Sequence, residues 1–232
     1  MCFSAQASFA GGAIISAIGV ATLIKIRKPS YLLFASIPLF FGIQQIAEGS
    51  LWITLPLSGY DGVQKISTYM FLIMAQVIWP IMIPLSVLFM EEVKKKRKIL
   101  YVLLFVGVAL SAYYVFCLFS FDVRPIIKGY HIQYDNDFPK SISNPAFLFY
   151  LIATIIPLFI SSIKRTRLMG YLMTFSCLVT AIFFTQYLTS VWCFFAALLS
   201  VVVYWIMSDS LELFNLEKLR LAKIFSINDD DN

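Results

Sequence analysis

Basic residues are confined to a few places in this chain. Fourteen of its 18 Lys and Arg residues lie in four clusters, and the segments between the clusters are almost purely apolar. The clusters are Lys25/Arg27/Lys28, Lys94 to Lys98, Lys164/Arg165/Arg167 and Lys218/Arg220/Lys223. Each intervening segment holds two apolar stretches of roughly 20 residues, enough to cross a bilayer core about 30 Å thick. One further stretch precedes the first cluster, so the pattern predicts seven membrane crossings.

The composition excludes a water-soluble protein. Hydrophobic residues make up 60% of the 232 residues and charged residues 13%, whereas a soluble domain is about 25% charged. Too few polar side chains are present to cover an exterior that faces water, so the expected partner is the lipid bilayer. The net charge of +5 comes from basic residues beside the apolar stretches, as in cytoplasmic loops, and no nucleic acid is expected as a partner.

We predict an all-α fold, a polytopic membrane domain of seven transmembrane helices over residues 1–208. The predicted spans cover about residues 9–24, 31–55, 66–90, 99–119, 145–163, 168–187 and 191–207. Pro38 lies in span two, and Pro80 and Pro84 lie in span three, where proline kinks a helix. An external loop, residues 120–144, joins spans four and five. Residues 209–232 are predicted to form an amphipathic tail along the cytoplasmic surface.

The positive charges also give the predicted orientation. Cytoplasmic loops accumulate Lys and Arg, so we place all four clusters in the cytoplasm. The opposite side then holds only Lys65, Arg124, Lys128 and Lys140. The expected protein is therefore a multi-pass protein of the cell inner membrane, with its N-terminus outside and its C-terminus in the cytoplasm.

Glu48 is the one charged residue well inside a predicted span. A carboxylate near the centre of a membrane helix costs roughly 2.5–3.5 kcal/mol, and such residues usually face a bundle interior or a wet cavity. Gln44, Glu48 and Trp52 are spaced four residues apart on one helix face, with Gln45 on the adjoining edge. We predict that this group binds a ligand. The alternative is an interhelical hydrogen-bond network, whose bonds contribute under about 2 kcal/mol each.

Further polar and aromatic side chains lie at a similar depth. Gln76 and Trp79 are near the middle of span three, and Gln186 is at the outer end of span six. Together with Glu48 they predict an outward-facing intramembrane pocket, with the loop around His131 as its lid. The expected ligand is a small or lipid-like molecule, bound for sensing or transport.

Two other functions remain open at this stage. The first is an intramembrane hydrolase, with Glu48 as acid or base and Cys2 or His131 as metal ligand or nucleophile. The second is a structural or assembly subunit. The four cysteines show no zinc-binding spacing, and the sequence identifies neither a cofactor nor a catalytic residue.

Two short motifs are similar to those of one family. The chain opens with the sequence MCFSA, and span two carries FGIQQ over residues 41–45, followed by Glu48, Gly49 and Trp52. These segments resemble an uncharacterised bacterial family of heptahelical membrane proteins. The resemblance extends over the whole chain and implies a seven-helix protein of the bacterial inner membrane. It implies no activity.

The predicted orientation can be tested at Cys2, because the other three cysteines lie inside apolar stretches. A membrane-impermeant thiol reagent added to intact cells should label Cys2, which is expected on the outer side. The Cys2→Ser variant is the control and should lose this labelling. Labelling that requires permeabilised cells would show that the orientation is reversed.

Overall fold

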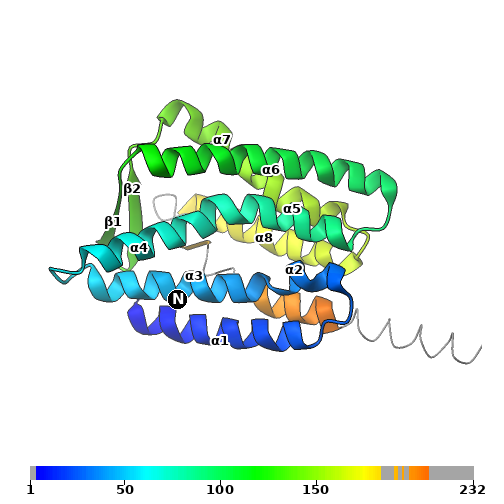
Figure 1. Cartoon of the computed structure of the whole chain (residues 1–232), viewed down its shortest axis with the longest axis horizontal. Coiled ribbons are helices and arrows are strands. Elements are labelled where there is room, and N and C mark those ends of the chain that lie inside the picture. The colour runs from blue at the N-terminus through cyan, green and yellow to red at the C-terminus, as the bar shows by residue number, and fades with distance from the viewer. Residues whose placement is uncertain (1–3, 184–190, 193–194, 196–198, 209–232) are drawn as a thin grey trace, which may run out of the picture.

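Apolar helices make up most of the structure, a computed structural model that describes residues 4–183, 191–192, 195 and 199–208 (Figure 1). In this part of the chain, six helices are long and apolar enough to cross a membrane. The predicted all-α membrane architecture is confirmed to that extent, and the six helices correspond to spans one to six. Of span seven, the apolar helix Leu199–Ser208 is described, so a seventh crossing stays a prediction. The predicted tail lies outside the described residues.

The elements follow the predicted spans closely, and one predicted loop contains strands. In chain order they are α1 (Ala5–Ile24), the 3-10 turn η1 (Pro29–Tyr31), α2 (Leu32–Ala35), α3 (Ile37–Thr54), α4 (Asp61–Leu72), the π-helix η2 (Ile73–Ile78), α5 (Trp79–Met90), α6 (Lys94–Ser120), β1 (Val123–Lys128), β2 (His131–Asn136), α7 (Lys140–Ile160) and α8 (Lys164–Phe183). The segments η1, α2 and α3 form one candidate span, and α4, η2 and α5 form another.

Small residues let α1 and α3 pack at very short range. A Cβ atom added to Gly42 would lie 2.1 Å from Ser16 Oγ, and one added to Gly19 would lie 2.7 Å from the backbone nitrogen of Leu39. Such sites allow two backbones to approach closely, which is how membrane helices gain packing energy when lipid is as apolar as the side chains. Gly12 and Ser16, four residues apart on α1, therefore mark the face that meets α3.

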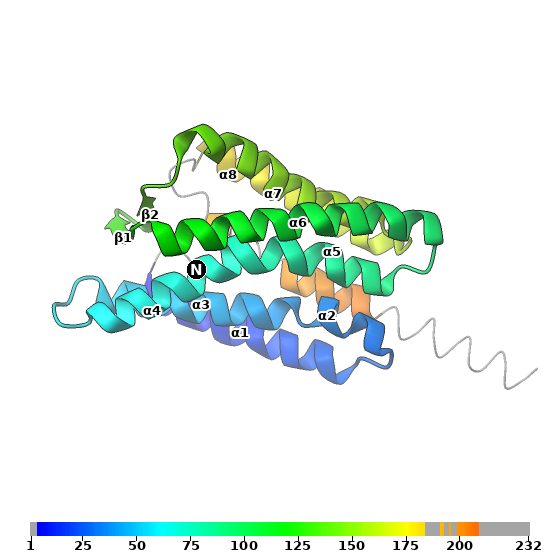
Figure 2. The same ribbon diagram turned by 45° about the horizontal axis from the view of Figure 1, so that its top comes forward.

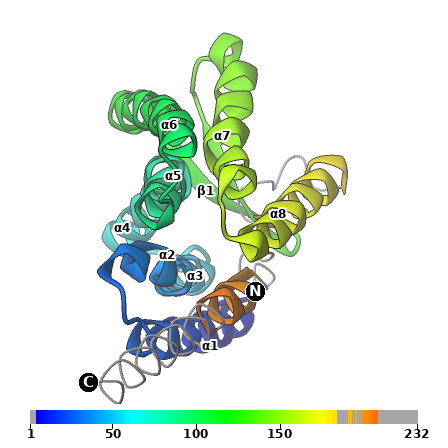
Figure 3. The same ribbon diagram turned by 90° about the vertical axis from the view of Figure 1, so that its right-hand side faces the viewer.

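The basic clusters of the described helices gather at one end of the bundle. Figures 1 and 2 show the turns before α2, between α5 and α6, and between α7 and α8 at the same end, opposite the β-hairpin. Lys96 Nζ donates to Ser162 Oγ at 3.0 Å, and Lys25 Nζ donates to Ser208 Oγ at 3.4 Å. The view from this end, in Figure 3, shows α1 on one side of the bundle and α6 and α7 on the other. Which end faces the cytoplasm stays a prediction.

The predicted external loop folds as a β-hairpin, which the sequence analysis did not anticipate. β1 and β2 pair in antiparallel register from Val123–Asn136 to Lys128–His131, and Gly129 has the positive φ of 61° that a tight turn favours. Ile132 is fully buried, and the ring of Tyr134 stacks on Phe71 of α4 at 4.8 Å. The hairpin is therefore packed against the end of the bundle.

Glu91 connects two of the three turns at this basic end of the bundle. Its carboxylate accepts hydrogen bonds from the Val93 N–H at 2.9 Å, the Ser162 N–H at 2.7 Å and Ser162 Oγ at 2.7 Å. Burial raises the pKa of Glu91, but these hydrogen bonds and the charge of Lys96 outweigh it, so the pKa lies below its ordinary value. Glu91, a residue that is 2% exposed, therefore joins the α5–α6 turn to the α7–α8 turn through its ionised carboxylate.

Replacing this carboxylate should destabilise the bundle in a pH-dependent way. The lowered pKa means that the ionised Glu91 stabilises the fold above its ordinary pKa of 4.5, and that this contribution is lost as the pH falls through the lower folded value. We expect Glu91→Gln to cost about 2 kcal/mol at neutral pH, because it weakens hydrogen bonds to a charged group. Thermal unfolding of the purified protein at pH 7 and at pH 4 measures the difference.

The matched control is Glu92→Gln, since Glu92 is adjacent and exposed. This variant should unfold like the parent at both pH values. Equal unfolding temperatures for the two variants at pH 7 would contradict the role given to Glu91.

Candidate functional site

The helix α4–η2–α5 changes its hydrogen-bond register in the middle of the bundle. In the π-helix η2, the Trp79 N–H donates to the carbonyl of Met74, five residues earlier, and not to that of Ala75. The next backbone nitrogen belongs to Pro80 and carries no hydrogen. The Ala75 carbonyl is thus left without a backbone donor, and π-helical segments of this kind occur frequently at functional sites.

Side chains from two neighbouring helices satisfy the carbonyls of this segment. Tyr150 Oη of α7 donates to the Ala75 carbonyl at 2.7 Å, and Ser111 Oγ of α6 donates to the Val77 carbonyl at 2.7 Å. Because no water is available in hydrocarbon, backbone groups in a membrane must find partners within the protein. The irregular segment is therefore held in place from two sides.

The helices α5 and α6 pack closely where Pro84 leaves a second carbonyl, this time in α5, without its helical donor. Pro84 cannot donate to the carbonyl of Pro80, four residues earlier, and Gly107 of α6 packs directly over that carbonyl. A Cβ atom on Gly107 would lie 1.9 Å from the Pro80 oxygen. Only a glycine admits this approach, so α5 and α6 are in backbone contact beside the π-helix.

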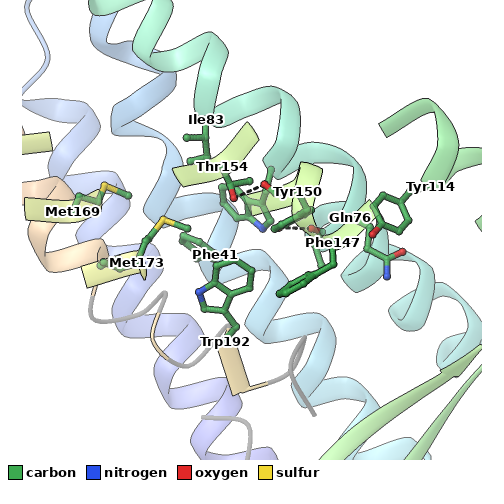
Figure 4. Close-up of a pocket in the computed structure, with 13 residues that line it drawn as sticks. Phe41, Gln76, Ile83, Tyr114, Phe147, Tyr150, Thr154, Met169, Met173 and Trp192 are labelled. Atoms are coloured by element: carbon green, nitrogen blue, oxygen red, sulfur yellow. Dashed lines mark hydrogen bonds between the residues drawn. The ribbon is translucent and has the colours of Figure 1, made fainter. Parts of the chain in front are cut away.

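A cavity of about 100 Å³ lies against this irregular segment, between α3, α5, α6, α7 and α8 (Figure 4). Its wall consists mostly of aromatic, aliphatic and methionine side chains. The lining residues are Phe41, Ala75, Gln76, Trp79, Ile83, Tyr114, Phe147, Tyr150, Thr154, Met169, Met173, Trp192 and Leu199. Among these described residues none is charged.

Three of the aromatic side chains on the wall have partners for their polar atoms, and one of them is Trp192, whose Nε1 donates to Ser176 Oγ at 3.1 Å. Trp79 Nε1 donates to Gln44 Oε1 at 3.1 Å, and the Trp79 ring stacks on Phe41 at a centroid distance of 4.0 Å. The Tyr150 hydroxyl is bonded to the Ala75 carbonyl, and the Tyr150 ring meets Trp192 edge to face at 5.7 Å. The rings therefore present apolar surfaces of defined geometry.

The polar groups on the wall are few. Thr154 Oγ1 donates to the Tyr150 carbonyl of its own helix at 2.7 Å. Gln76 is half-buried, and its Oε1 is a buried atom without a hydrogen-bond partner. Figure 4 shows Gln76 and Tyr114 toward one end of the labelled residues and Met169 and Met173 toward the other.

The cavity extends further toward the basic end than the pocket that the polar residues predicted. The polar residues had predicted a pocket in the outer half, yet Met169 follows Lys164 of the basic end by five residues, about 7.5 Å along a helix. The lining therefore reaches well toward the basic end. Side-chain polarity could not reveal this, because that part of the cavity is bounded by apolar residues.

The structure separates the residues predicted for the ligand site into two groups. Gln76 and Trp79 line the cavity, and Gln44 holds the Trp79 indole while donating to the Phe71 carbonyl at 3.5 Å. The other described members are Glu48 and Gln45, which are 0% and 1% exposed, and Trp52. These three lie on α3 and are not among the lining residues.

Further buried polar atoms lie on α3 beyond Gln44. Both side-chain amide atoms of Gln45 and the Nε1 atom of Trp52 are buried without a hydrogen-bond partner. The part of Glu48, Gln45 and Trp52 in ligand binding stays a prediction. Gln186 lies outside the described residues.

Of the two candidate metal ligands, the structure describes His131. His131 begins β2, where burial lowers the pKa of its imidazole, and Cys2 lies outside the described residues. In the described part of the chain, no three His, Cys, Asp or Glu side chains are grouped closely enough to hold a metal ion. Metal binding by Cys2 or His131 stays a prediction.

The sequence did not predict that most of the lining residues face a cavity. Tyr150, Met169 and Met173 lie in predicted spans and resemble any lipid-facing residue. The one usable signal was the pair Pro80 and Pro84 just after Gln76, because two prolines in one membrane helix leave carbonyls that other helices must satisfy.

Removing the Tyr150 hydroxyl should destabilise the protein, because it leaves the buried Ala75 carbonyl without a donor. We expect Tyr150→Phe to cost about 1–3 kcal/mol, measured by thermal or denaturant unfolding. The control is Tyr171→Phe on the exposed face of α8, where the side chain is 63% exposed and the change should stay within about 0.5 kcal/mol. Similar stabilities for both variants would refute the proposed support of the π-helix.

The sequence matches the model of one protein family over most of its length. No curated protein and no solved structure matches the chain significantly. A family model described as a family of unknown function matches residues 1–213, a range that includes both motifs on which the resemblance was based. The chain therefore belongs to this family of unknown function, DUF6629.

Proposed function

We propose that this protein is a multi-pass protein of the bacterial inner membrane that binds a small molecule in the cavity beside η2, for sensing or transport. Its N-terminus is outside, its C-terminus is in the cytoplasm, and residues 191–207 form the seventh span. The observation that carries the proposal is the cavity itself, which lies where the helix α4–η2–α5 is irregular.

The irregular helix supports this assignment. A π-helix and two prolines disturb a helix that would be more stable if regular, and such features persist where the surrounding structure enforces them. Here Tyr150 and Ser111 enforce them through bonds to the Ala75 and Val77 carbonyls. Tyr150 supplies one of these bonds and part of the cavity wall.

Gln44 links the cavity to the polar residues further along α3. Its Oε1 atom receives the Trp79 indole hydrogen, and Glu48 follows one helical turn later on the same face. We propose that Glu48, with Gln45 and Trp52, affects ligand binding indirectly. These residues set the position of α3, and α3 carries the Gln44 side chain that is hydrogen-bonded to Trp79 of the cavity wall.

Binding in the cavity can be tested with fluorobenzene, a small ring whose fluorine reports binding by NMR. The purified protein in lipid nanodiscs should shift or broaden the fluorobenzene resonance in a saturable manner. Thr154→Met should abolish the saturable part, because methionine fills irregular apolar gaps and Thr154 lines the cavity. The signal left in this variant measures partition into lipid.

The control variant is Thr174→Met. Thr174 Oγ1 bonds to the carbonyl four residues earlier at 2.8 Å, as Thr154 Oγ1 does at 2.7 Å, but Thr174 is not among the cavity-lining residues. This variant should therefore bind fluorobenzene like the parent. Equal signals from the parent and Thr154→Met would overturn the proposed function.

A further inference from the structure

The chemistry of the cavity wall also restricts the ligand. Resting on the proposed function, we infer that the cavity takes an uncharged molecule of the size of a single ring that carries one hydrogen-bonding group, such as a phenol or another cyclic alcohol. Gln76 binds the hydroxyl group, and the aromatic and methionine side chains enclose the ring.

Charge is the first restriction. None of the described residues that line the cavity is charged. Transfer of an unpaired ion from water into such surroundings costs several kcal/mol even after relaxation. Glu48, the carboxylate within a span, is not on the wall. The described lining residue of α3 is Phe41, which stacks on Trp79 of α5. We therefore infer that the ligand is a neutral molecule.

Size is the second restriction. The cavity measures about 100 Å³, whereas an apolar cavity of roughly 150 Å³ in another protein binds benzene. This volume suits a molecule of about one ring, which enters with small side-chain movements. Met169 and Met173 provide them, because methionine has three rotatable bonds and adapts its shape. A phospholipid or a long acyl chain does not fit within this volume.

The shape of the wall favours a ring. Trp79 and Phe41 are stacked with an interplanar angle of 28°, and Tyr150 and Trp192 meet at 62°. Aromatic faces and edges arranged in this way attract another ring in offset-stacked or edge-to-face geometry. Methionine sulfurs also make favourable contacts with ring edges.

Gln76 is the polar anchor of the cavity. Its carboxamide lies on the π-helix with Oε1 buried and without a hydrogen-bond partner, and leaving such an atom unpaired costs about 1–3 kcal/mol. A carboxamide both donates and accepts hydrogen bonds, and so does a hydroxyl group. Tyr114 also lines the cavity and lies toward the same end as Gln76 in Figure 4.

Three fluorinated rings test this ligand class by the same NMR titration in nanodiscs. We expect 4-fluorophenol to bind about three- to tenfold more tightly than fluorobenzene, as one neutral hydrogen bond allows. We expect 4-fluorobenzoate, which is ionised at neutral pH, to show no saturable binding. In Gln76→Leu, the ratio of the 4-fluorophenol affinity to the fluorobenzene affinity should fall to about one, because the hydroxyl group loses its hydrogen-bond partner.

The outcomes separate the two proposals. Failure of all three rings to bind saturably would overturn the proposed function. Saturable binding of fluorobenzene with an unchanged 4-fluorophenol preference in Gln76→Leu would leave the cavity as the binding site and overturn the role of Gln76. Saturable binding of 4-fluorobenzoate to the parent would overturn the neutral ligand class, a result that does not depend on whether Gln76→Leu folds.

Discussion

A helix inside hydrocarbon must satisfy its backbone polar groups without water, and the helix α4–η2–α5 does so only through its neighbours. The π register and Pro80 deprive the Ala75 carbonyl of a backbone donor, and Tyr150 of α7 replaces it at 2.7 Å. Ser111 of α6 bonds the Val77 carbonyl in the same segment. The arrangement of α5, α6 and α7 is thus tied to one irregular helix, and the cavity lies at their junction.

The same requirement explains the chemistry of the cavity. Side chains on its wall use their polar atoms to bond other protein groups, as Trp79 does with Gln44 and Thr154 with its own helix. The rest of the described wall consists of aromatic, aliphatic and methionine side chains, with the Gln76 carboxamide and the Tyr114 phenol. Ionised groups are stabilised elsewhere, as at Glu91 in the turn at the basic end. The described wall of the cavity is therefore uncharged.

The sequence predicted the parts of the site that are unusual for a membrane helix. Gln76 and Trp79 were found because a carboxamide and an indole stand out in an apolar span, and both line the cavity. Tyr150, Met169 and Met173 were missed because apolar and aromatic residues are equally suited to lipid and to a protein interior. The hairpin was missed although Gly129 and the isoleucines around it are typical of a turn between strands.

The sequence by itself determined the six described long helices and the grouping of their basic turns, because helix length and charge position follow directly from bilayer thickness and from the cost of burying Lys and Arg. Only the tertiary structure decided which apolar faces meet, where Gly42 and Gly107 allow backbones to touch, and which residues enclose the cavity. The physical reason is that lipid and protein interior are nearly alike in polarity. Hydrophobicity along the chain therefore does not distinguish a residue that faces lipid from one that lines a cavity.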